Sequence, residues 1–114
     1  MIVESLMLVN VAIRFLLELF GLFVYGYWGY KVGGTAAMRW GLAIGIPLII
    51  ATAWGLFGSP KAAFLLSGFP HLLLEIGVFL IPAVLLLNLG KVPLALIYGI
   101  IVILNRLLMY IWDQ

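Results

Sequence analysis

An arginine and a glutamate lie four residues apart inside the strongly apolar stretch NVAIRFLLELF, residues 10–20. Arg14 and Glu18 are residue types that bind polar solutes, exchange protons or form buried ion pairs within membranes. A second glutamate, Glu75, follows His71 at the same four-residue spacing in HLLLEIGVF. Because ionisable groups are costly in hydrocarbon, these side chains are predicted to face one another inside a helical bundle and not lipid.

The polar side chains of the first, third and fourth predicted helices share one face of each helix when they are counted at about 100° per residue. Those of the first, third and fourth helices also lie at a similar depth, counted from the end that carries the N-terminus. The sequence therefore predicts one shared polar layer. The candidates for a substrate or proton site in this layer are Glu18, Glu75, Arg14, Arg106, His71, Asn10, Asn105 and Trp54.

Arg14 and Arg106 are expected to counter the two carboxylates, because arginine stays protonated and its planar fork matches a carboxylate. Arginine four residues before glutamate is the weaker order for a pair within one helix. We therefore expect pairs between helices, such as Glu18 with Arg106, to matter more. Glu18 or Glu75 would exchange a proton or bind a cationic or polar substrate. The alternative is a layer that only fixes helix register.

The elements that position these residues follow from composition. Of the 114 residues, 67% are hydrophobic and 9% charged, whereas about a quarter of a soluble domain is charged. Four apolar segments, at about 6–28, 39–57, 69–87 and 93–112, are each long enough to span a bilayer. Their short connections make neighbours antiparallel. The predicted fold is all-α: a polytopic integral membrane protein with a single transmembrane domain, residues 1–114, formed by a four-helix antiparallel bundle.

Two segments of the chain, RFLLELFGLF and HLLLEIGVFL, align so that Arg14 matches His71 and Glu18 matches Glu75. The shift between them is half the chain, which indicates two duplicated helical hairpins; chance similarity of Leu-rich helices is the alternative.

The second helix carries a stripe of mostly small residues that would let a neighbouring backbone approach closely. This stripe consists of Pro47, Ala51, Trp54, Gly55 and Gly58.

Two prolines and two tryptophans within or beside the apolar segments have simple structural interpretations. Pro47 and Pro82 are expected to be tolerated kinks whose freed carbonyl groups are satisfied by neighbours, with hinges as the alternative. Trp54 and Trp112 are most simply interfacial anchors.

The loop cations bear on orientation. Lys31, Arg39 and Lys91 lie beside the first and third loops, against Lys61 in the second, which favours termini outside by the positive-inside rule. If Arg14 and Arg106 are counted with Lys61 on the side of the termini, each side has three cations, so insertion in both orientations stays open.

Several classes of function are disfavoured by what the sequence lacks. Without cysteine there is no disulfide, thiolate metal site or dithiol chemistry, and His71 alone is expected to be a hydrogen-bonding partner and not a metal ligand. We therefore predict no metal and no cofactor. An enzyme is disfavoured because no phosphate loop, nucleophile elbow or paired-His motif occurs. The expected partners are the lipid bilayer and a homo-oligomer or larger membrane complex, with no nucleic acid.

The stretches NVAIRFLLEL, PLIIATAWGLFGSPKA, LLLEIGVF and ILNRLLM, in this order, together resemble the small bacterial four-span YrdB-like membrane proteins, a family of unknown function. The matching residues are Asn10, Arg14, Glu18, Trp54, Gly55, Phe57, Pro60, Lys61, Glu75, Asn105 and Arg106. The resemblance implies a multi-pass protein of the bacterial cytoplasmic (inner) membrane, and it implies no activity. In its size, its four spans and a glutamate in the first helix, the chain also looks like the small multidrug-resistance exporters, but their sequence pattern around that glutamate is absent.

The leading hypothesis from the residues is therefore transport or permeation of a proton, cation or small polar solute. The alternative is a non-catalytic accessory or structural membrane protein in which the polar layer only holds the bundle together.

Overall fold

The computed structural model describes residues 1–58 and 62–112. Within these residues the chain forms four α-helices and no strand: α1 (Ile2–Val32), α2 (Ala36–Phe57), α3 (Gly68–Asn88) and α4 (Val92–Ile111). All four are long and apolar enough to cross a membrane. The all-α class and the four apolar helices predicted from the sequence are confirmed.

The largest difference from the predicted boundaries is in the first two helices. α1 extends four residues further at each end than predicted, because nothing in its aromatic segment interrupts it before Gly33, whose N–H donates to Gly29 O at 3.2 Å. α2 begins at Ala36 because the hydroxyl of Thr35 caps it, accepting from the N–H of Met38 at 3.2 Å. The connection between α1 and α2 is therefore only three residues long.

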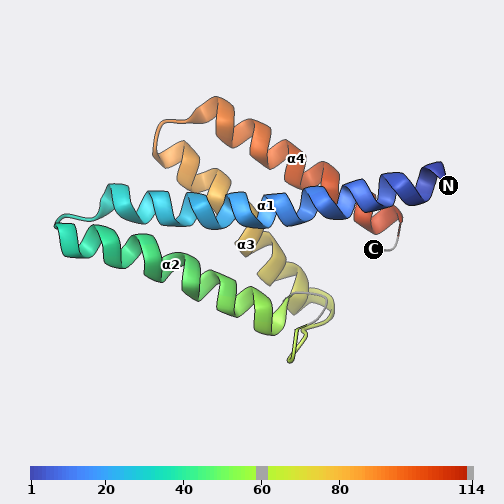
Figure 1. The fold of residues 1–114 in the computed structure, drawn as a ribbon, viewed down its shortest axis with the longest axis horizontal. Coiled ribbons are helices and arrows are strands. Elements are labelled where there is room, and N and C mark those ends of the chain that lie inside the picture. The colour runs from blue at the N-terminus through green and yellow to red at the C-terminus, as the bar shows by residue number, and fades with distance from the viewer. Residues whose placement is uncertain (59–61, 113–114) are drawn as a thin grey trace.

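α1 lies along the length of the molecule, with α2 on one side and α4 on the other, and α3 crosses α1 from beside the end of α2 to the side of α4 (Figure 1). Among the described residues, α1 and α3 each pack against all three other helices, whereas α2 and α4 do not touch. The start of α1 and the end of α4 lie at one end, and the α1–α2 and α3–α4 connections lie at the other (Figure 1). The buried apolar cluster between the helices consists of Leu17, Val24, Trp54, Phe79, Leu86, Ala95, Tyr98 and Val102.

Pro82 in α3 leaves the carbonyl of Val78 without its usual helical donor. The hydroxyl of Tyr25, from α1, lies 3.2 Å from Val78 O and 3.0 Å from Gly77 O, and its one hydrogen is shared between these two carbonyl oxygens. A neighbouring helix thus satisfies the carbonyl that the proline frees, which confirms that part of the prediction for Pro82.

Pro47 in α2 frees the carbonyl of Ala43 in the same way. Gly26 of α1 packs directly against that carbonyl, so a Cβ at Gly26 would lie 2.8 Å from Ala43 O. The close approach of α1 and α2 therefore depends on a glycine of α1. The predicted α2 stripe contributes at Pro47, whose Cγ would lie 3.2 Å from the same Cβ, but not at Gly55, where a Cβ would meet nothing within 4 Å.

Candidate functional site

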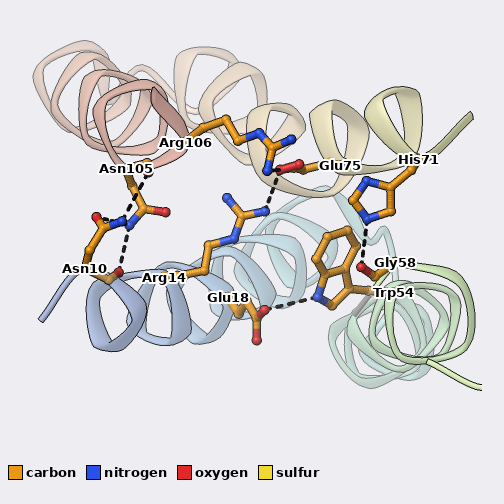
Figure 2. A network of polar contacts seen from close by, with 9 residues as sticks. All are labelled: Asn10, Arg14, Glu18, Trp54, Gly58, His71, Glu75, Asn105 and Arg106. Atoms are coloured by element: carbon orange, nitrogen blue, oxygen red, sulfur yellow. Dashed lines mark hydrogen bonds and ion pairs between the residues drawn. The ribbon is translucent and has the colours of Figure 1, made fainter. Parts of the chain in front are cut away.

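Side chains from all four helices form a polar cluster toward the end of the molecule that carries both termini (Figure 2). All eight residues that the sequence singled out as candidates lie in this cluster. The polar cluster consists of Asn10, Arg14, Glu18, Trp54, His71, Glu75, Asn105 and Arg106.

The centre of the cluster is a glutamate shared by two arginines. Nη2 of Arg14 lies 2.8 Å from Oε1 of Glu75, and Nη1 of Arg106 lies 3.3 Å from the same oxygen. The side chains of Arg14 and Glu75 are only 9% and 5% exposed, whereas that of Arg106 is 38% exposed. The Arg14–Glu75 pair is therefore buried, and Arg106 supports it from the edge.

The guanidinium of Arg14 also lies over aromatic rings, 3.7 Å from the ring centre of Phe79 and 5.8 Å from that of Trp54. Such a cation–π contact is strongest where water is excluded. Phe79 was not among the sequence candidates, although its position four residues after Glu75 places it on the same face of α3. Among the described residues, Nη1 of Arg14 and Oε2 of Glu75 are buried and have no hydrogen-bond partner.

Glu18 is half-buried and is held by a neutral donor, the indole N–H of Trp54, at 3.1 Å. The predicted pair of Glu18 with Arg106 is wrong, because each binds a different partner. One turn beyond Arg14 the face of α1 has rotated by about 40°, which directs Glu18 toward α2 and away from α4. Trp54 is only 8% exposed, so its interpretation as an interfacial anchor is also wrong.

His71 binds a backbone carbonyl at the edge of the cluster, with its Nε2 2.9 Å from Gly58 O. A carbonyl oxygen can only accept, so Nε2 carries the hydrogen. The ring of His71 packs 5.9 Å from that of Trp54. If the chain is a duplicated hairpin, the Arg14–Glu75 contact should have a counterpart between His71 and Glu18. No such contact occurs among the described residues. Glu18 instead binds Trp54 of α2, and His71 binds Gly58 at the end of α2.

Asn10 and Asn105 join α1 to α4. The side-chain amide of Asn105 donates to the backbone and side-chain oxygens of Asn10, both at 2.8 Å, and both residues are 3% exposed. With this contact, every pair of helices that pack together is joined by a polar contact of the cluster; for α2 and α3 it runs from His71 to Gly58, the residue directly after α2. The polar cluster therefore connects all four described helices at this end.

A cavity of about 510 Å³ opens beside the cluster. Five of its lining residues are the ionisable members Arg14, Glu18, His71, Glu75 and Arg106, and residues 65–68, which lead into α3 and begin it, form part of its wall. A smaller, mostly apolar cavity of about 230 Å³ between α3 and α4 reaches the same two arginines and Glu75 from another side. The ion pairs therefore border two open spaces. In the described part of the chain no group of three metal-ligating side chains converges.

Four helices apolar enough to cross a bilayer, joined by a buried polar cluster, define a membrane-like helical bundle. The chain belongs to the family described as "Protein of unknown function (DUF2568)", whose model matches residues 12–103. The match includes Arg14 and both glutamates of the polar cluster and ends before Arg106. No curated protein and no solved structure matches the chain. Pro60 and Lys61, which contribute to the resemblance and to the count of loop cations, lie outside the described residues.

Proposed function

We propose that the chain is a multi-pass integral membrane protein with four antiparallel spanning helices, and that its polar cluster is a site for permeation of a proton, cation or small polar solute. The observation that carries this proposal is the cavity of about 510 Å³, which brings open space to buried ionisable side chains. Intramembrane ionisable groups beside a cavity are typical of solute and proton pathways. The YrdB-like resemblance supports a bacterial cytoplasmic membrane as the setting.

The two glutamates have different roles in this proposal. Glu75 stays ionised and has a structural role, because protonating it would leave the guanidinium groups of Arg14 and Arg106 without their shared counter-charge. Glu18 takes its described hydrogen bond from a neutral indole, is half-buried and lines the cavity. Glu18 is therefore the carboxylate that binds the cation or takes up the proton, and Trp54 orients it.

His71 supplies a second proton acceptor on the same cavity. Its Nε2–H donates a hydrogen bond to Gly58 O. Nδ1 is therefore the ring nitrogen that can accept a proton from the cavity. Glu18 and His71 both contact Trp54, one through the indole N–H and the other through the ring face. A proton in the cavity thus has two neighbouring acceptors that are held in place by one tryptophan.

A structural role is the second candidate, and one observation favours it. The cluster supplies a polar contact to every pair of packed helices in the described bundle. Buried polar contacts at single positions can fix register without chemistry. In this role the protein is a non-catalytic accessory or structural component of a larger membrane assembly.

A measurement of proton flux into liposomes distinguishes the permeation role from the structural role. The purified protein is reconstituted into vesicles that contain a pH-sensitive dye, and flux is driven by an imposed membrane potential. The wild type should exceed protein-free vesicles, and Glu18→Gln should return flux to that background because glutamine cannot take up a proton. Glu4→Gln is the matched control, since Glu4 lies on α1 but is exposed and pairs with the N-terminal amine.

Equal flux in Glu18→Gln and the wild type would remove Glu18 from the pathway. Absence of flux for protons and for monovalent cations, from protein with full helicity, would favour the structural role. Membrane insertion is tested separately by thiol labelling of intact cells, for which the absence of native cysteine provides a clean background. With four antiparallel spans, Ser5→Cys and Lys91→Cys should label from opposite sides.

A further inference from the structure

The end of the molecule opposite the polar cluster carries uncompensated positive charge. Lys31 lies in the last turn of α1, Arg39 in the first turn of α2, and Lys91 directly before α4. The connections next to these residues lie at the same end (Figure 1). The chain has no aspartate or glutamate in residues 19–74 or 76–112. No carboxylate from the described part is therefore available to neutralise this end.

Aromatic rings contact these three cations in place of carboxylates, and Nε of Arg39 also donates to Gly33 O at 3.2 Å. Nζ of Lys31 lies 5.4 Å and Nζ of Lys91 6.0 Å from the ring centre of Tyr27. The guanidinium of Arg39 lies 5.5 Å from the ring of Tyr30, which packs against Trp40 at 5.4 Å. A ring attracts a cation but leaves its full charge in place. We call these six residues the cationic rim.

An apolar groove begins at this rim and lies between α1 and α2. Its volume is about 610 Å³, and its walls are formed by Leu22, Phe23, Gly26, Tyr27, Tyr30, Trp40, Ala43 and Pro47. Tyr27, Tyr30 and Trp40 belong to both the rim and the groove. The lining residues of α1 extend from Leu22 to Tyr30, eight rises along the helix, which corresponds to roughly 12 Å. The groove is long enough for part of an acyl chain.

We propose that the cationic rim and the groove bind an anionic phospholipid, with its phosphate at the rim and an acyl chain along the groove. Charge complementarity selects this occupant, because three cations without a carboxylate favour a headgroup with net negative charge. A zwitterionic phospholipid brings its own cation to the rim. Free phosphate would leave the groove empty. The proposal rests on membrane insertion as proposed above and is independent of permeation through the polar cluster.

The test measures lipid retention by native mass spectrometry of the protein in detergent, with added phosphatidylglycerol or phosphatidylcholine of identical acyl chains. The wild type should retain phosphatidylglycerol preferentially. Replacing Lys31, Arg39 and Lys91 together by glutamine should reduce that preference by roughly fivefold for each cation removed. Exchanging lysine for arginine and arginine for lysine at the same three positions keeps the charge and should keep the preference.

A second pair of variants tests the groove. Ala43→Leu places added volume inside it, whereas Ala51→Leu adds the same volume on an exposed face of the same helix. Ala43→Leu should lower retention of phosphatidylglycerol, and Ala51→Leu should leave it unchanged. Excess inorganic phosphate should not displace the lipid.

Three results would each overturn the proposal: equal retention of the two lipids by the wild type, a preference that survives loss of the three cations, or full binding by Ala43→Leu. Displacement by inorganic phosphate would show a simple anion site and would also overturn it. Proton flux measured in phosphatidylcholine vesicles reports on the polar cluster separately, so failure of one proposal is distinguishable from failure of the other.

Discussion

Replacement of Glu75 by glutamine should be strongly destabilising, because it removes the carboxylate that Arg14 and Arg106 share. The side chain of Arg14 is 9% exposed and 2.8 Å from Glu75, and a buried charge that loses its partner costs about 3 to 5 kcal/mol. Arg106 is 38% exposed and more distant, at 3.3 Å, so its share is about 1 kcal/mol or less. We expect Glu75→Gln to lower the free energy of unfolding by about 3 to 5 kcal/mol.

The measurement is an SDS titration of the protein in mixed micelles, followed by tryptophan fluorescence, since Trp54 lies in the cluster. Arg106→Gln is the matched single variant and should lose about 1 kcal/mol or less. Arg14→Gln combined with Glu75→Gln removes both buried charges together and should be much milder than Glu75→Gln alone.

Two outcomes would refute this reasoning about the buried pair. One is a loss in Glu75→Gln no larger than that in Arg106→Gln, which would mean that Arg14 does not depend on Glu75. The other is a double variant whose loss equals the sum of the single losses, which would show no coupling between the two side chains.

Two further pairs of variants can be measured in the same titration. Tyr25→Phe removes the hydroxyl that donates to the α3 carbonyl oxygens and should cost about 1 kcal/mol; Tyr98→Phe should be neutral, because that buried hydroxyl has no partner among the described residues. A larger loss in Tyr98→Phe would reverse this assignment. Gly26→Ala should push α1 away from α2, since its Cβ would lie 2.8 Å from a backbone oxygen, whereas Gly45→Ala meets nothing within 4 Å and should not destabilise the protein. Equal stability of these two alanine variants would show that α1 and α2 do not need the glycine contact.

The existence of four helices was predictable because each apolar run is long and bounded by turn residues or charges. Their ends were less predictable, because the aromatic segment before Gly33 is typical both of a membrane interface and of a continuing helix. The capping of α2 by Thr35 is visible in the sequence only once the helix start is known.

The membership of the polar cluster followed from helical faces and depth, but its pairing did not. Face and depth place Glu18 and Arg106 in one layer without saying which helices are neighbours. The structure brings Glu75 between the two arginines and turns Glu18 toward Trp54. The contact of His71 with Gly58 O had no sequence signal, since any backbone carbonyl at that depth can accept.

The hydroxyl of Tyr25 and the ring of Pro82 make two distant positions evolutionarily dependent on each other. In a lineage with alanine at position 82, the helix would supply its own donor to Val78 O, and the hydroxyl on α1 would become dispensable. Loss of the hydroxyl first, with the proline still in place, would leave a partly buried acceptor unpaired. Replacing the proline first would therefore avoid the unpaired carbonyl that replacing the tyrosine first creates.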